Sequence, residues 1–178
     1  MSTVTWRIPN KRDRRLLQSF SCARELAPTG RPAPWEREVQ TYFRSEALAD
    51  TNGSLTHDQR FRIAEDAQGV AAAYTHARPA DVHPDLILPP DCACRYLLMI
   101  AVALRHRNQG GKFADEVMID ALHDIAEREP DHDSIAIIAR IDHRNAPSRN
   151  MFLRAGFEEV VPGNSVSRLS WWLLVLER

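Results

Sequence analysis

The second half of the chain alternates between uniformly apolar runs and amphipathic stretches. Tyr96–Leu104 and Ile135–Ile141 are almost unbroken apolar runs, which is typical of strands buried on both faces. Leu169–Leu176 predicts a third strand. Between them, Phe113–Ala126 repeats apolar residues at helical spacing, and Ala146–Ala155 reads as a short helix that stops at a glycine. The pattern therefore predicts strands that alternate with helices.

The first half gives a weaker pattern with the same kinds of element. We expect a short strand at Thr3–Ile8, a helix capped by Asp13 that runs to Phe20, and a helix from Trp35 to Ala49. Phe61–Ala64 and Val70–Tyr74 predict the two strands of a hairpin. Strands and helices in this order indicate an α/β or α+β layered fold around a mixed sheet, within a single domain that spans residues 1–178.

Charge and composition exclude some classes of protein. Lys and Arg total 23 against 24 Asp and Glu, so the net charge of −1 argues against a protein that coats nucleic acid or an anionic membrane. No apolar run approaches the roughly 20 residues of a membrane-spanning helix, and the first residues contain no apolar signal-peptide core. We expect a cytoplasmic protein.

Cysteines and tryptophans add two minor expectations. Cys22, Cys92 and Cys94 have no disulfide-framework spacing. Cys92 and Cys94 would share one face of a strand and could hold a metal, but they lack a nearby Cys/His pair, so we expect small core or rim residues and no metal. Adjacent Trp171 and Trp172 must point to opposite faces of a strand. One should enter the core, and the other needs cover from a helix or from a second copy in a homodimer.

The clearest candidate for chemistry is the loop between the first apolar strand and the long helix. Gly110 and Gly111 let the backbone approach a ligand closely, and the N-terminus of a helix favours phosphate. Arg105, Arg107 and Lys112 add positive charge. A tight turn with solvated basic residues explains the same loop equally well. Neither a P-loop nor a dinucleotide-binding glycine motif is present.

This segment resembles the acetyl-CoA segment of the GNAT superfamily of acetyltransferases. Val102–Ala114 aligns without gaps on an apolar strand end followed by Arg/Gln-x-x-Gly-x-Gly/Ala at the start of a helix. Gln109 matches the first position and Ala114 the last, whereas Lys112 stands where the family prefers glycine. A second register, shifted by two residues, instead aligns Arg107 with the first position.

A second resemblance lies downstream, where the family places it. Asn145–Phe157 is similar to the family segment Asn-x-x-Ala/Ser-x-x-Leu/Met-Tyr-x-x-x-Gly-Phe. A capped helix that ends at Gly156 accounts for the glycine and Phe157, but it does not predict Asn145 and Ser148 at those offsets.

The resemblance implies a mixed, mostly antiparallel central sheet, with splayed central strands and helices on both faces. It also implies acetyl-CoA as the co-substrate and no metal. The residues it assigns to the cofactor are Val102, Ala103, Leu104, Gln109, Gly110, Gly111, Lys112, Phe113, Ala114, Asn145, Ser148, Arg149 and Phe152. Arg149 reads equally well as a solvated helix residue.

The catalytic residues are harder to assign. The family's proton-donating tyrosine is Phe152 here, so we expect Ser148, Tyr96 or Tyr74 to replace it, or water to serve. A base or a water relay must accept the proton of the amine. The candidates for this role are Glu65, Asp66, Asp142 and His143. Of all these, Asp142, Tyr96 and Ser148 are the residues to which we assign catalysis.

Three functions remain open on the sequence. The first is an N-acetyltransferase that acts on a primary amine of a small molecule or protein, and the second is a regulatory module that binds acyl-CoA without catalysis. The third is a toxin-like acetyltransferase of aminoacyl-tRNA, suggested by the basic residues Arg7, Lys11, Arg12, Arg14 and Arg15. A solvated helix face also explains those residues. The acceptor should be selected by the first two helices and the proline-rich segment Ala80–Asp91.

Overall fold

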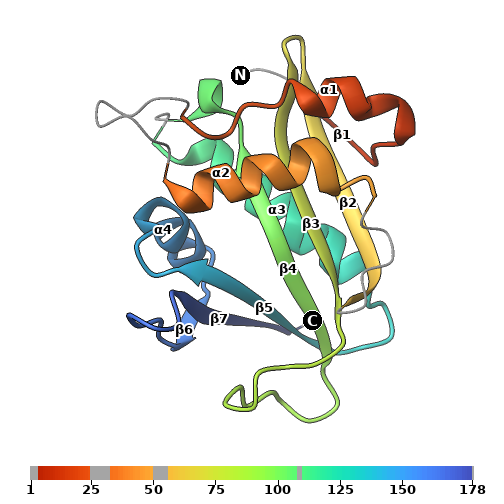
Figure 1. Cartoon of the computed structure of the whole chain (residues 1–178). Coiled ribbons are helices and arrows are strands. Elements are labelled where there is room, and N and C mark those ends of the chain that lie inside the picture. Colours follow the sequence, from red (N-terminus) through yellow and green to blue (C-terminus); the bar gives the residue numbers. More distant parts are fainter. Residues whose placement is uncertain (1–3, 25–32, 50–55, 108–109, 178) are drawn as a thin grey trace.

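A computed structural model describes residues 4–24, 33–49, 56–107 and 110–177 (Figure 1). Its strands are β1 (Thr5–Arg7), β2 (Thr56–Asp66), β3 (Gly69–Pro79), β4 (Ala93–Val102), β5 (Ser134–Asp142), β6 (Glu158–Val161) and β7 (Leu169–Glu177). Its α-helices are α1 (Arg14–Gln18), α2 (Pro34–Thr41), α3 (Lys112–Glu127) and α4 (Ala146–Arg154). Short helical turns are η1 (Lys11–Asp13), η2 (Tyr42–Glu46) and η3 (Leu104–His106).

The strands form one sheet in the order β1-β2-β3-β4-β5-β7-β6. All neighbouring strands are antiparallel except β4 and β5, which run parallel and are joined by α3. The mixed, mostly antiparallel sheet confirms the expected fold class.

Helices cover both faces of the sheet (Figure 1). On one face, Phe113, Val117 and Ile125 of α3 share a core with Phe152 of α4. On the other face, a second core contains Leu17 of α1, Phe43 of η2 and the side chains of β2, β3 and β4 that point to this face. The stripe predicted for Phe113–Ala126 is therefore the buried face of α3.

The β2–β3 hairpin is longer than the sequence predicted, because its ends are held by charged pairs. Arg60 of β2 and His76 of β3 both hydrogen-bond the fully buried carboxylate of Asp124 on α3, at 2.9–3.1 Å and 2.8 Å. Farther along β3, Arg78 pairs with buried Glu129 at 2.6 Å. The strands expected at Phe61–Ala64 and Val70–Tyr74 stop short of these polar residues, whose side chains are matched by acidic partners on and after α3.

Several element boundaries differ from the prediction for local reasons. The helix expected at Trp35–Ala49 ends at Thr41 and continues as the wider turn η2. The strand expected to reach Leu104 ends at Val102, because the N–H of Leu104 donates instead to the carbonyl of Ser21 at 2.9 Å. The edge strand β6 was not predicted.

The two tryptophans of β7 lie on opposite faces, as expected. Trp172 is 1% exposed within the core. Trp171 is half-buried on the other face, where His83 and Tyr96 cover its ring at centroid distances of 5.2 Å and 6.1 Å. The cover thus comes from this chain, and a homodimer stays a prediction.

Candidate cofactor and acceptor site

The sheet opens between β4 and β5. Their parallel pairing runs from Ala93 opposite Ile135 to Leu97 opposite Ala139, although β4 continues to Val102 and β5 to Asp142. The separation begins at a register shift against β3, where Met99 pairs with Thr75 and Leu97 with His76. Leu98 is therefore the extra residue of a β-bulge, and a bulge increases the local twist of a strand. The result is a fork between the two strands, which diverge visibly in Figure 1.

The fork is lined by apolar residues that the fold leaves partly uncovered. Leu98, Met99 and Ile100 are only half-buried, although they lie in the middle of the most apolar strand. Beyond the fork, Val102 pairs with Ala72, and the N–H of Ala103 donates to Ala71 at 2.8 Å. An extended ligand therefore has an apolar strand edge to lie against between Leu98 and Val102.

Directly after β4, the chain turns into α3 through two glycines in the left-handed region. Gly110 has φ +66° and Gly111 has φ +81°, a conformation that glycine adopts without the penalty of other residues. The first backbone bond of α3 runs from the N–H of Asp115 to Gly111, so the N–H groups of residues 112–114 open towards the helix N-terminus. These are the expected positions for a phosphate group. Gln109 lies outside the described residues.

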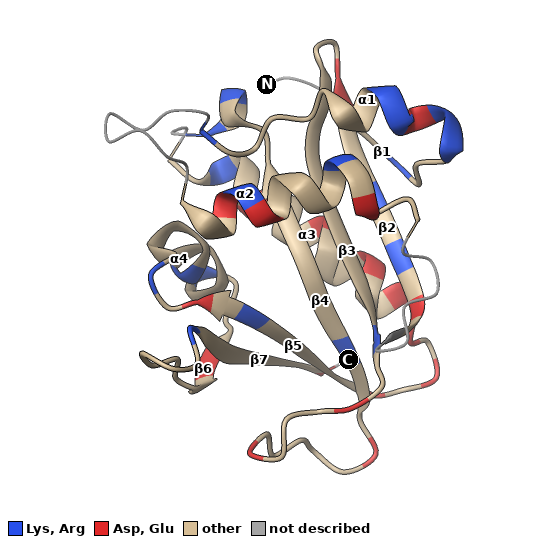
Figure 2. Ribbon diagram, viewed as in Figure 1, with Lys and Arg blue, Asp and Glu red and all other residues tan. Residues whose placement is uncertain are grey.

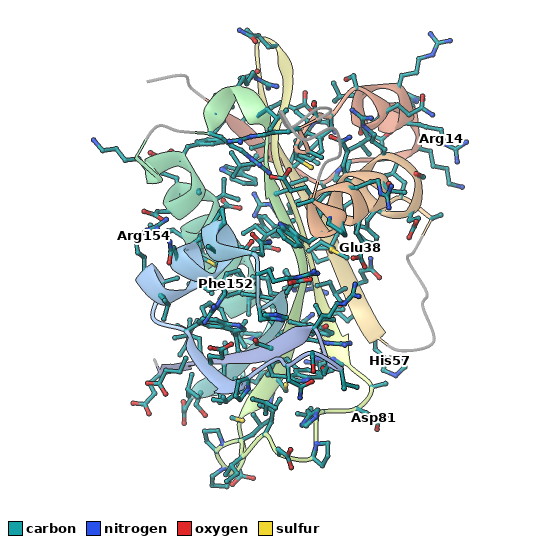
Figure 3. All side chains as sticks on the ribbon, turned by 60° about the vertical axis from the view of Figure 1, so that its left-hand side comes forward. Arg14, Glu38, His57, Asp81, Phe152 and Arg154 are labelled. Carbon is teal, nitrogen blue, oxygen red and sulfur yellow. The ribbon has the colours of Figure 1, made fainter. Side chains whose placement is uncertain are left out.

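Arg154 of α4 supplies a cation that the sequence did not point to. A Cβ placed on Gly111 would lie 2.9 Å from Nη2 of Arg154, so the guanidinium rests directly over the glycine. Asp115 orients it through a 2.6 Å hydrogen bond. Figure 3 shows Arg154 at the periphery of the molecule.

Two arginines expected around the loop are instead used within the fold. Arg105 and His106 both bind Asp66, at 2.9 Å and 2.6 Å. Burial alone would raise the pKa of Asp66, but these hydrogen bonds lower it to about 2. Arg107 pairs with Glu36 of α2 at 2.5 Å and also donates to the carbonyl of Cys22. These two arginines therefore fasten the loop to its neighbours.

The second predicted segment begins on the other side of the fork. Asn145 caps α4: its Oδ1 accepts from the N–H of Ser148 at 3.3 Å and its Nδ2 donates to the Ser148 hydroxyl at 3.1 Å. Arg149 pairs with Glu159 at 3.0 Å and donates to the carbonyl of His143. The hydroxyl of Ser148 accepts one hydrogen bond and keeps its own proton available.

Phe152 belongs to the core. It is 3% exposed and contacts the rings of Phe157 and Trp172 at 4.7 Å and 6.4 Å. Its position inside the molecule is visible in Figure 3. A hydroxyl in its place would enter an apolar environment.

A cleft of about 530 Å³ opens on the α2 side of the sheet. Its walls come from α2, from the end of β5 with nearby Arg144, and from the turn into β7. The lining residues are Pro34, Trp35, Glu38, Arg140, Asp142, Arg144, Val166, Ser167, Arg168 and Leu169. Figure 2 shows acidic positions on α2 and a basic position on β5, two of the elements that line this cleft. The cleft adjoins the fork, because Arg140 is the first β5 residue beyond the last β4–β5 pair.

Asp142 lies in this cleft, but it is a weak base. Arg144 binds both of its carboxylate oxygens, at 2.9 Å and 2.7 Å. These hydrogen bonds lower the pKa of Asp142 to about 2, against the opposing effect of burial. A carboxylate with so low a pKa accepts a proton from an ammonium group with difficulty.

Tyr96 lies one residue before the end of the β4–β5 pairing. Partial burial raises its pKa, while a hydrogen bond from Arg140 works in the opposite direction. The phenol therefore keeps its proton at neutral pH. Tyr74, by contrast, points away into the α3 side, where its hydroxyl donates to Asp120 at 2.6 Å.

The remaining base candidates are held elsewhere. Glu65 pairs with Arg7 at the β1–β2 edge. His143 lies at the end of β5, where its backbone N–H donates to the carbonyl of Arg168 and its Nδ1 lies 3.0 Å from the same oxygen. The structure thus brings Tyr96 and Asp142 to the fork and leaves Glu65, Asp66 and Tyr74 apart from it.

Within the described residues, no group of three His, Cys, Asp or Glu side chains has the arrangement of a metal site. Cys22 is buried, and Cys92 and Cys94 are half-buried free thiols. In the same part of the chain, every helix is too short or too polar to cross a bilayer.

Comparison with known proteins agrees with this architecture. No protein-family model and no curated protein sequence matches the chain. Among solved structures, it is similar to a GNAT-family protein from Desulfovibrio desulfuricans assigned as an acetyltransferase, with 19% identity, TM-score 0.59 and coverage of 98% and 99% of the two chains. It is also similar to the PaiA N-acetyltransferase of Thermoplasma acidophilum in complex with coenzyme A, with 10% identity, TM-score 0.61 and coverage of 99% of both chains.

A third similar structure is the aminoglycoside acetyltransferase AAC(6′)-Ib in complex with ribostamycin and coenzyme A, with 16% identity, TM-score 0.58 and coverage of 99% and 94%. At these identities the similarity establishes the fold. The chain has the fold of the GNAT acetyltransferases, which is the fold that the resemblance in its sequence implies.

The residues that sequence reasoning missed depend on contacts between segments that are distant along the chain. Trp35, Glu38, Arg140 and Arg168 meet only when α2 is packed across the ends of β5 and β7. Arg154 ends α4 and contacts the start of α3, 43 residues earlier at Gly111. No local sequence signal marks any of them.

Proposed function

We propose that this protein is an acetyl-CoA-dependent N-acetyltransferase that acetylates a primary amine. The fork between β4 and β5 carries this proposal, because it joins an unpaired apolar strand edge to a glycine-opened helix N-terminus. The similar structures that contain coenzyme A have the same fold.

The residues present fit such a cofactor. The edge of β4 from Leu98 to Val102 suits an extended pantetheine arm, which can hydrogen-bond as an added strand. The N–H groups of residues 112–114, the side chain of Lys112 and the guanidinium of Arg154 suit its phosphates. Bound acetyl-CoA would supply the activated acyl group. Asn145 and Ser148 would flank the arm from the α4 side.

For the chemical step, the site contains two groups that can donate a proton, whereas its carboxylate is a poor general base. Tyr96 and Ser148 each retain a proton near the fork, and Tyr96 is the better assignment because its hydroxyl is hydrogen-bonded to Arg140, which lines the cleft. Asp142 is held ionised by Arg144, so it orients Arg144 and does not take up the amine proton. We therefore expect ordered water to accept the amine proton.

Binding of coenzyme A and turnover test the proposal separately. Isothermal titration with acetyl-CoA should give saturable binding, and Lys112→Glu should weaken it on the order of tenfold by placing a negative charge beside the phosphates. The only other lysine, Lys11, is exposed on η1 away from the fork, so Lys11→Glu is the matched control. Equal effects of the two substitutions would contradict the assigned phosphate site.

Release of free thiol from acetyl-CoA with a panel of amines tests catalysis. Tyr96→Phe should lower kcat by about 10²-fold and leave acetyl-CoA binding unchanged, because it removes a proton donor but no cofactor contact. Saturable binding without thiol release from any amine would instead support the non-catalytic acyl-CoA-binding module.

A further inference from the structure

The charged residues of the cleft on the α2 side do not neutralise one another. Of the five that line it, Asp142 and Arg144 form a pair at 2.7 Å. Glu38, Arg140 and Arg168 have no ion-pair partner within the described ranges. Most of the other arginines near the fork, such as Arg107, Arg149 and Arg154, are paired with carboxylates. The cleft therefore keeps two uncompensated guanidinium groups opposite one carboxylate.

Arg140 is held at the mouth of the fork. It follows Ala139, the last β5 residue paired with β4, and both Ala139 and Ile141 belong to the core on the α3 side. Because side chains alternate along a strand, Arg140 faces the cleft. Its guanidinium stacks on Trp171 at 5.1 Å and hydrogen-bonds Tyr96, so its position is fixed by neighbours that carry no negative charge.

Arg168 is placed on the same side by the start of β7. Leu169 pairs with Asp142, and the carbonyl of Arg168 accepts the backbone N–H of His143 at 3.0 Å. The backbone is thus fixed, while the exposed side chain is free of hydrogen bonds in the part of the chain that the structure describes. Glu38 faces these arginines from α2, where Figure 3 labels it.

A guanidinium group binds a carboxylate with matched, charge-assisted hydrogen bonds. A carboxylate held by Arg140 would put an amine on the neighbouring carbon close to the fork. The side chain of such a ligand would extend into the cleft towards Trp35 and Glu38. A polycationic amine fits poorly, because it would meet two unpaired arginines and one unpaired carboxylate.

We propose that the acceptor is an α-amino acid, whose carboxylate is bound by Arg140 and Arg168. This inference rests on the proposed acetyltransferase function and names the substrate class of the same site. It gives the two arginines a role in substrate specificity, and it assigns Glu38 to the outer part of the cleft.

Matched pairs of acceptors test the inference. Thiol release is measured with the common α-amino acids and with the α-amide of each, which keeps the amine and side chain but lacks the carboxylate. The amide has the less basic amine, because no neighbouring negative charge stabilises its ammonium form, so simple reactivity favours the amide. A higher kcat/KM for at least one acid than for its amide is the expected result. Arg168→Gln should then raise KM for that acid roughly 10- to 100-fold with little change in kcat.

Arg14→Gln is the control, since it makes the same chemical change at an exposed residue of α1 that does not line the cleft. Acetyl-CoA binding by each variant verifies that the protein is folded. Turnover of amides, spermidine or aminoglycosides in preference to every amino acid would overturn the inference and leave the acetyltransferase function standing. If none of the amines tested led to thiol release, both the acceptor inference and the acetyltransferase function would be overturned.

Discussion

Alanine substitutions at the two glycines before α3 can distinguish the effect of backbone strain from the effect of displacing the Arg154 side chain. Both have positive φ, +66° at Gly110 and +81° at Gly111. A Cβ on Gly110 would meet nothing within 4 Å, whereas a Cβ on Gly111 would lie 2.9 Å from Arg154. Alanine in the left-handed region costs roughly 1–2 kcal/mol. Each of Gly110→Ala and Gly111→Ala should therefore lower the melting temperature by about 2–8 °C in a chain of this size.

Binding of coenzyme A should distinguish the two variants. The Arg154 side chain is long and half-exposed, so it can move aside in Gly111→Ala at little cost to stability, but it then leaves its place over the loop. If that guanidinium binds phosphate, Gly111→Ala should bind coenzyme A on the order of tenfold more weakly than Gly110→Ala. Isothermal titration measures this difference, and urea unfolding measures the shared loss of stability.

Arg154→Ala completes the comparison. It should weaken coenzyme A binding by itself, and adding Gly111→Ala should then have no more effect than Gly110→Ala has, because the displaced group is already absent. Equal affinities of the two glycine variants would refute the role given to Arg154. So would an undiminished affinity in Arg154→Ala.

Three further predictions follow from buried groups. Phe152→Tyr should lower the free energy of unfolding by about 1–3 kcal/mol without raising kcat, because its hydroxyl would enter the core; a higher kcat would contradict this placement. Asp124→Asn should cost about 3–5 kcal/mol in urea unfolding, since it leaves Arg60, Arg62 and His76 without their buried carboxylate. Asp142→Asn should retain the shape of the pH–rate profile, because Asp142 is ionised throughout the neutral range.

Controls accompany each of these predictions. Asp85 is exposed and lies in the loop before β4, so Asp85→Asn should change stability little and makes the same chemical change as Asp124→Asn. The folded pKa of Asp142 is about 2, below its usual value of 3.8, so its stabilisation is present above that value and is lost as pH falls towards 2. Asp142→Asn should therefore lower the urea midpoint at pH 7 and have little effect near pH 2. The loss of an acidic limb from the rate profile, or a large fall in kcat at neutral pH, would refute the assignment of a structural role.

The Asp124 cluster shows why the hairpin was underestimated. Burial alone would raise the pKa of Asp124, but hydrogen bonds from His76, Arg60 and Arg62 keep it well below its usual range. Figure 2 shows acidic positions of α3 behind basic positions of β2. The expected strands stop short of Arg60 and His76 because polar residues break an apolar pattern, and here the Asp124 carboxylate compensates both side chains within a covered sheet.

The loop that suggested a phosphate site was predictable from local chemistry alone. An apolar strand, two glycines and an amphipathic helix specify a turn with positive φ and an open helix N-terminus, whatever packs around it. The same holds for the cap by Asn145 and for the stop at Gly156, whose φ is +88°. Their causes lie within a few residues along the chain, and a sequence displays such causes directly.

The tertiary structure decided everything that depends on distant partners. The bulge at Leu98 opens the fork only because β3 and β5 pair with β4 on its two sides. Packing removed Arg105 and Arg107 from the phosphate loop and brought Arg154 to it. It likewise left Arg140 and Arg168 unpaired in one cleft. The sequence alone determined where a glycine-containing turn opens the N-terminus of a helix, whereas ion pairing across the fold determined which charges remain without a partner among the described residues.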